Sequence, residues 1–162
     1  MSDQPPRYFL AQSPIHRVPL GDGTRGEIRV QDGHLFVCKG CCCGNTDRDF
    51  APVPLVEFKR QWKDRGIRRR IHLTISGCLG PCSMANVVLL VFDGRTVWLH
   101  SIESATDVSL IYDHIETMLL AGRFLPLPAG LESRHFQRYL DDSIDQRDCA
   151  LEPPCAEKIL LE

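Results

Sequence analysis

Cysteines are the residues of this chain best suited to chemistry. Eight of them occur among 162 residues, in three groups at positions 38–43, 78–82 and 149–155. The N-terminal residues show no basic stretch followed by an apolar one, so we expect no secretory signal and a cytoplasmic protein. In that reducing compartment, clustered cysteines more often bind metal or do redox chemistry than form structural disulfides.

The second group is a compact pair. Cys78 and Cys82 are separated by three residues in the sequence SGCLGPC. This spacing lets both sulfur atoms point into one site from a tight loop. Gly77 and Gly80 allow backbone amides to approach the sulfur atoms, which lowers the free-energy cost of holding several thiolates together.

The first group, CKGCCCG, offers three partners for Cys38. Cys41, Cys42 and Cys43 follow it with two, three and four intervening residues. Two thiolates from each group would make a four-cysteine site for a [2Fe–2S] cluster, a [4Fe–4S] cluster or a structural zinc ion. Zinc fits less well, because zinc ribbons use C-x2-C pairs about 15–20 residues apart, whereas 36 residues separate Cys41 from Cys78.

The elements between the two groups predict how they meet. Residues 34–38 and 71–77 are predicted strands, and each leads directly to a cysteine loop. Residues 55–66 form a predicted helix between them, with apolar side chains on one face. If the strands are parallel neighbours, their carboxyl ends and both loops lie at one edge of the sheet, where ligand sites form in open α/β sheets.

The remaining elements complete the sheet. Residues 86–100 predict a β-hairpin around Asp93 and Gly94, and the apolar run 87–92 predicts a central strand covered on both faces. Residues 104–122 predict an amphipathic helix that ends at a glycine. We therefore expect an α/β fold with a mixed sheet of about four strands, flanking helices and two cysteine loops at one sheet edge.

Three segments are predicted along the chain. Residues 1–32 form an N-terminal arm with a short strand at 26–30. Residues 33–125 form the cysteine-bearing domain, and residues 126–162 form an acidic C-terminal extension with a short surface helix at 131–145. Cys149 and Cys155, in this extension, are interpreted as ordinary thiols.

Charge and hydropathy exclude several function classes. The net charge is −2, with 13 Lys and Arg against 8 Asp and Glu in residues 1–80 and an acidic excess after them. This layout suits docking or self-association more than nucleic-acid binding. No apolar run is long enough to span a membrane. No catalytic motif is present, so we expect no enzymatic activity of the chain itself.

The stretch HLFVCKGCCCG with ISGCLGPCSMANVVLLVFDGRTVWLHSI resembles the thioredoxin-like [2Fe–2S] ferredoxins, among them the Shethna-type ferredoxins and the small [2Fe–2S] subunit of NADH dehydrogenases. The resemblance covers roughly residues 33–121. It implies a thioredoxin-like fold, a one-electron [2Fe–2S] carrier, a homodimer, and a reductase and an electron acceptor as partners. The sequence is also similar to ferredoxins encoded beside cobalamin-biosynthesis genes, which would imply a corrinoid-pathway acceptor.

The same resemblance implies the cluster ligands. They are Cys38, Cys43, Cys78 and Cys82, because a C-x4-C pair matches the NADH-dehydrogenase branch. The run of three cysteines at 41–43 departs from the family pattern, so the second ligand of the first loop stays open, with Cys42 next after Cys43.

Two other functions are kept as alternatives. A zinc-stabilised interaction module would use the basic segment 59–70 to bind a partner, but the apolar content already supports a core without metal. A thiol–disulfide oxidoreductase would use Cys38 and Cys41 as a C-x-x-C motif. That function leaves Cys78 and Cys82 without a role.

Overall fold

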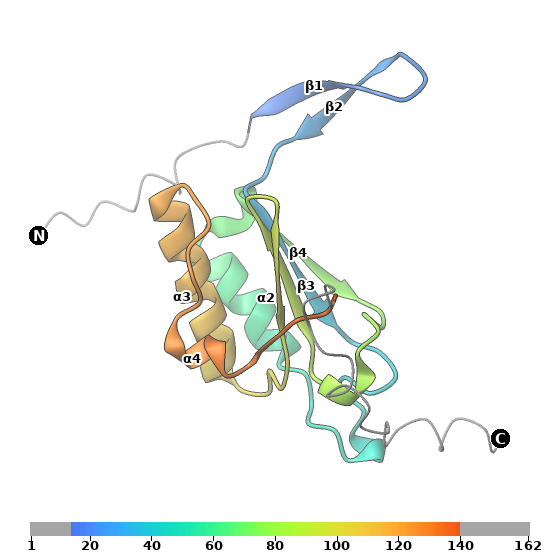
Figure 1. Cartoon of the computed structure of the whole chain (residues 1–162), viewed down its shortest axis with the longest axis vertical. Coiled ribbons are helices and arrows are strands. Elements are labelled where there is room, and N and C mark those ends of the chain that lie inside the picture. Colours follow the sequence, from blue (N-terminus) through green and yellow to red (C-terminus); the bar gives the residue numbers. More distant parts are fainter. Residues whose placement is uncertain (1–13, 140–162) are drawn as a thin grey trace, which may run out of the picture.

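The computed structural model describes residues 14–139, so Cys149 and Cys155 lie outside the described residues. Its body is a mixed five-stranded sheet with the strand order β4–β3–β5–β6–β7 (Figure 1). The strands are β3 (Gly33–Cys38), β4 (Ile71–Ser76), β5 (Val88–Phe92), β6 (Arg95–Leu99) and β7 (His135–Phe136). β3 and β4 are parallel, and the other neighbouring pairs are antiparallel. The predicted mixed α/β fold is confirmed, with a fifth strand of two residues added.

Helix α2 (Leu55–Asp64) connects the two parallel strands, as the sequence predicts. Parallel neighbouring strands need such a crossover, because the chain must return from the end of the first strand to the level where that strand began before it can run in the same direction again. α2 begins after Pro54, and Gly66 follows it with a φ of 70°, a conformation that costs glycine little. The short 3-10 helix η2 (Ile67–Arg69) then leads into β4.

Helix α3 (Ala105–Ala121) lies beside α2 on the same face of the sheet (Figure 1). Its N-terminus is closed by a capping box: the Ser104 hydroxyl accepts from the backbone N–H of Asp107, whose carboxylate accepts from the backbone N–H of Ser104. Gly122 ends the helix with a φ of 64°. The buried face of α3 packs against the inner sheet face and forms the main apolar core of the described residues.

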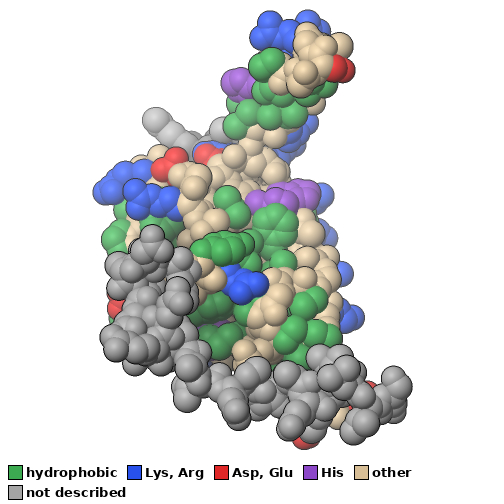
Figure 2. All heavy atoms as spheres, turned by 45° about the vertical axis from the view of Figure 1, so that its right-hand side comes forward, with side chains coloured by type: hydrophobic (Ala, Val, Ile, Leu, Met, Phe, Trp, Pro, Cys, Tyr) green, Lys and Arg blue, Asp and Glu red, His purple; other side chains and the backbone are tan. Residues whose placement is uncertain are grey.

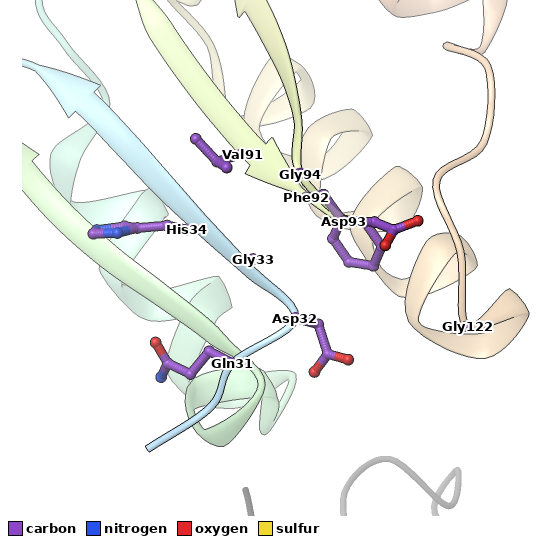
Figure 3. A pocket seen from close by; sticks show the side chains of 9 residues that line it. All are labelled: Gln31, Asp32, Gly33, His34, Val91, Phe92, Asp93, Gly94 and Gly122. Atoms are coloured by element: carbon purple, nitrogen blue, oxygen red, sulfur yellow. The ribbon is translucent and has the colours of Figure 1, made fainter. Parts of the chain in front are cut away.

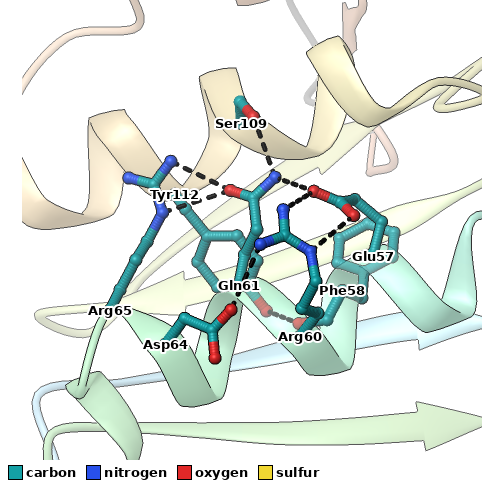
Figure 4. Close-up of polar contacts among 8 residues, drawn as sticks. All are labelled: Glu57, Phe58, Arg60, Gln61, Asp64, Arg65, Ser109 and Tyr112. Carbon is teal, nitrogen blue, oxygen red and sulfur yellow. Dashed lines mark hydrogen bonds and ion pairs between the residues drawn. The ribbon is translucent and has the colours of Figure 1, made fainter.

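Polar side chains fix the contact between α2 and α3. The Gln61 side chain donates to the Ser109 hydroxyl at 2.8 Å, and the buried Tyr112 hydroxyl donates to the Phe58 carbonyl at 2.9 Å (Figure 4). Burial raises the pKa of Tyr112, so this hydroxyl stays protonated. The two helices therefore meet through both apolar packing and directed hydrogen bonds.

The expectation that the strand at 87–92 is covered on both faces is wrong. Along β5, Val88, Leu90 and Phe92 are buried, whereas Leu89 and Val91 are half-buried. The reason is that both long helices lie on one side, and no described helix covers the other face. Hydrophobic side chains gather on that open side of the molecule (Figure 2).

The N-terminal arm contains a hairpin rather than a single strand. β1 (Ile15–Pro19) pairs antiparallel with β2 (Arg25–Arg29), which overlaps the predicted strand at 26–30. The hairpin projects away from the sheet (Figure 1). β1 was missed because its residues do not alternate clearly between apolar and polar.

The predicted surface helix at 131–145 is wrong over the described residues. The chain instead forms one helical turn, α4 (Ala129–Glu132), and then β7, which pairs with β6. Phe136 lies opposite Trp98 in this pairing. The reason is a tertiary contact, because the edge strand β6 is available to pair with the chain as it returns to the sheet. Among the described residues, no helix combines the length and hydropathy of a membrane span.

Candidate metal centre

The two cysteine loops meet at one edge of the sheet, as predicted. Cys38 is the last residue of β3, and Cys78 follows two residues after the end of β4, so the parallel strands bring both loops together. The approach is close: a Cβ atom on Gly40 would lie 2.8 Å from the backbone N and Cα of Cys78. Only glycine at position 40 allows the backbones to touch in this way.

Three thiols converge from the two loops. The Sγ atom of Cys41 lies 3.0 Å from that of Cys82 and 3.9 Å from that of Cys78. The Sγ atoms of Cys78 and Cys82 are 3.4 Å apart. Among the described His, Cys, Asp and Glu side chains, these three form the one group close enough to hold a metal ion.

The other two predicted ligands lie beside this group. Cys38 and Cys43 are buried and pack together with Val87 and Trp98. The backbone N–H of Val87 donates to the Sγ atom of Cys43 at 3.4 Å. Cys38, Cys43, Cys78 and Cys82 line one small cavity, and Cys41 and Cys42 also line it. The structure therefore gathers all six cysteines of the two loops around one cavity, and the choice of the four ligands stays a prediction.

The pKa values of the thiols shift in different directions. The hydrogen bond with Cys82 lowers the pKa of Cys41, and the same bond raises the pKa of Cys82. Burial raises the pKa of Cys43 to about 12. Thiols must lose their protons to bind metal, so metal binding at this cavity would release protons and would weaken at low pH.

Backbone amides stabilise negative sulfur on both loops. The N–H of Gly80 donates to the Sγ atom of Cys78 at 3.3 Å, as the glycines of SGCLGPC suggest. The 3-10 helix η3 (Cys82–Met84) follows directly. Together with the Val87 amide, which donates to Cys43, this means that one cysteine sulfur of each loop accepts a backbone N–H. Such bonds are a means by which proteins tune thiolate-bound clusters.

Asn86 is a structural residue of the site that the sequence interpretation missed. It is 1% exposed, and its side-chain oxygen accepts from the backbone N–H of Gly44 at 2.8 Å. Its amide nitrogen donates to the carbonyl of Ala51 at 2.9 Å. Asn86 thus ties the segment after the second loop to the first loop, which ends near the 3-10 helix η1 (Thr46–Arg48). The available signal was a polar residue directly before the apolar run 87–92.

Two other hollows lie at the opposite end of the parallel strands. The first is lined by Asp32, Gly33, Phe92 and their neighbours and offers no group of metal ligands (Figure 3). Asp32 in this pocket is already paired with Arg70. The second is a basic groove lined by Arg29, Trp62, Lys63, Gly66, Arg68, Arg69 and His72. It contains Lys63, Arg68 and Arg69 of the basic segment 59–70.

No family model and no curated protein matches the chain. Among solved structures, the chain is similar to a thioredoxin-like [2Fe–2S] ferredoxin from Aquifex aeolicus, with a TM-score of 0.45 and 20% identity over 72% of this chain and 100% of that one. A crystal structure of the wild-type form of that ferredoxin gives a TM-score of 0.44 and 21% identity over 67% of this chain and 100% of that one.

Proposed function

We propose that this protein is a one-electron carrier whose [2Fe–2S] cluster is held by cysteine thiolates from its two loops. The observation that carries the proposal is the convergence of Cys41, Cys78 and Cys82, with Sγ separations of 3.0–3.9 Å, at the rim of a cavity lined by three further cysteines. An all-thiolate donor set is the one that [2Fe–2S] clusters use most often.

Cys78 and Cys82 supply the ligands of the second loop in this proposal. From the first loop we propose Cys38 and Cys43, in keeping with the family resemblance. Cys41 is the competing ligand, because its sulfur is already within 3.0 Å of Cys82. When bound, the cluster supplies a site that accepts and returns one electron.

The surrounding residues suit electron transfer at a surface. Cys38 and Cys43 are buried beneath the site, whereas Cys41 and Cys78 are exposed to solvent. A bound cluster would therefore be anchored on its inner side and accessible on its outer side. We propose a reductase and an electron acceptor as transient partners that dock at this edge, since redox encounters are typically weak and steered by charge.

The homodimer and the acceptor in corrinoid metabolism stay predictions. The open face of the sheet, with half-buried Leu89 and Val91, is a candidate surface for a second copy. Light scattering during size-exclusion chromatography would decide this point. A monomer at every concentration tested would contradict the homodimer.

The first experiment is purification without oxygen, followed by an absorption spectrum and assays of iron, sulfide and zinc on the same sample. We expect broad bands beyond about 400 nm that bleach with dithionite, with roughly two irons and two sulfides per chain. Single substitutions of Cys38, Cys41, Cys42 and Cys43 by serine would then identify the ligands of the first loop.

The same assay tests the zinc-stabilised module. Three sulfur atoms within 3.9 Å of one another would also suit one tetrahedral ion. A colourless protein with one zinc per chain would overturn the carrier. A thiol–disulfide oxidoreductase has less support, because Cys38 is buried and no described α-helix begins directly after Cys41.

A further inference from the structure

The C-terminal strap, defined as residues 126–139, returns to the cysteine edge of the sheet. It is held firmly. Leu131 is 1% exposed in the core, and the Arg134 guanidinium forms an ion pair with Asp107 at 2.8 Å. The backbone N–H of His100 donates to the Arg134 carbonyl at 2.9 Å, and β7 extends the sheet. The strap therefore has a defined path over its described length.

This path brings one guanidinium to the second cysteine loop. Arg138 Nη2 lies 2.8 Å from the position that a Cβ atom on Gly80 would occupy. Gly80 stands between Cys78 and Cys82, and its backbone N–H donates to Cys78 Sγ. Arg138 thus fits against the loop because position 80 carries no side chain, and its guanidinium lies against the residue that stands midway between Cys78 and Cys82 in the chain.

Aromatic rings hold the guanidinium in place. The Arg138 Cζ atom lies 5.9 Å from the ring centroid of Trp98 and 5.9 Å from that of Tyr139. Trp98 is 7% exposed and belongs to the same buried cluster as Cys38 and Cys43. Cation–π contacts of this kind fix the orientation of an arginine without neutralising its charge.

No described carboxylate pairs with Arg138. Among the described residues, therefore, no acidic side chain offsets its positive charge. A four-thiolate [2Fe–2S] site is negatively charged, and reduction adds one more negative charge. A cation held against the loop stabilises the more negative state more strongly, because the interaction energy scales with the product of the charges.

We infer that Arg138 is a positioning residue that places a fixed positive charge against the second cysteine loop, where it favours the reduced form of the centre and attracts anionic reagents to the thiols. The redox part of this inference rests on the proposed function. The strap is then a functional part of the site, and the C-terminal extension has a role that the sequence interpretation did not assign.

The test uses the full chain with Arg138→Gln, with Arg138→Lys to keep the charge and Arg95→Gln as a matched control. Arg95 also places its guanidinium over an aromatic ring, 5.2 Å from the centroid of Phe124, but it lies at the hairpin end of β6. In a potentiometric titration, we expect Arg138→Gln to lower the reduced-to-oxidised ratio at fixed potential about three- to tenfold, where tenfold corresponds to about 59 mV for one electron.

A second readout needs no cluster. In metal-free protein, exposed thiols react with an anionic disulfide reagent, dithiobis(nitrobenzoate), and with neutral iodoacetamide. We expect Arg138→Gln to slow the reaction with the anionic reagent about threefold more than the reaction with the neutral one, and added salt to remove the difference.

The outcomes separate the two proposals. A charge-specific change in thiol reactivity without any iron–sulfur cluster would overturn the electron carrier and leave the role of Arg138 at the thiols intact. A loaded cluster with the same potential in Arg138→Gln, Arg95→Gln and the unmodified chain, together with equal thiol reactivity, would overturn the role of Arg138. If Arg138→Lys keeps both the potential and the thiol reactivity of the unmodified chain while Arg138→Gln changes both, the result would support the role of the charge at position 138.

Discussion

The α2–α3 contact and the cysteine edge differ in how their polar groups are satisfied. At the helix contact, Arg65 donates to Asp113 and Glu116, each at 2.6 Å, and Gln61 bonds across to Ser109. At the cysteine edge, thiols lie against thiols with pKa values shifted in opposite directions. Arg138 there has no described carboxylate partner. The polar groups named at the helix contact are paired within the chain. The converging thiols at the cysteine edge instead have a metal ion or cluster as their expected partner.

The largest expected effect is the loss of metal binding when a cysteine of the second loop is replaced. Cys78→Ser and Cys82→Ser should each abolish stable metal binding, because each removes a thiolate from the group of converging sulfur atoms. Metal content and absorbance measure the loss. The circular dichroism of the helices should stay unchanged, since the α2–α3 contact does not involve the loop. Retention of full metal content by both variants would contradict the assigned site.

A smaller effect is expected where the two loops touch. Gly40→Ala should destabilise the fold by about 2 kcal/mol and weaken metal binding, because its Cβ would press on the Cys78 backbone at 2.8 Å. Gly77→Ala is the matched control, since a Cβ there meets nothing within 4 Å. Denaturant unfolding and metal titration measure both. Equal behaviour of the two alanine variants would show that the close approach is unimportant.

At the helix contact, we expect substitutions to lower the stability of the fold without changing metal binding. Arg65→Ala should cost about 1–2 kcal/mol of unfolding free energy, because it removes the guanidinium that donates to both Asp113 and Glu116. Arg60→Ala should cost clearly less than Arg65→Ala, since the Arg60 side chain is 55% exposed. Neither should change the metal content. Loss of metal from Arg65→Ala would mean that the two regions are coupled.

The smallest expected effect is on the stability of the protein at acidic pH. Hydrogen bonds from Arg60 and Gln61 lower the pKa of Glu57 to about 2, from an ordinary value of 4.5. The folded protein therefore binds this proton less readily than the unfolded chain, so the stabilisation is present above pH 4.5 and is lost as the pH falls toward 2. Glu57→Gln should flatten the decline of stability in that window. An unchanged pH profile would contradict this assignment.

The sequence predicted the elements that bring the cysteines together. The strand at 71–77 and the helix at 55–66 each carry a clear hydrophobic period, and the strand at 34–38 is rich in residues that favour strands and ends at the first cysteine loop. Their parallel pairing then follows from the crossover, so the meeting of the two loops at one sheet edge was predictable.

The parts that sequence did not predict depend on distant contacts. β7 contains two residues, too few for any period, and forms because the edge of β6 is free to pair with it. Asn86 and Arg138 act on residues more than 30 positions away, so no local pattern marks them. The choice among Cys41, Cys42 and Cys43 depends on how the chain turns after Gly40, and spacing alone does not determine which sulfur points into the cavity.

The distance along the chain between the converging thiols has a further consequence. Cys41 and Cys78 are 37 positions apart, at the two ends of the crossover that contains α2. A metal centre bound to both loops acts as a cross-link that closes this length of chain, and the loss of unfolded-state entropy is roughly 3–4 kcal/mol on the chain-entropy account. Loading the site would then slow or prevent opening of the whole β3–α2–β4 unit, so resistance to proteolysis would report on how much of the protein carries its metal.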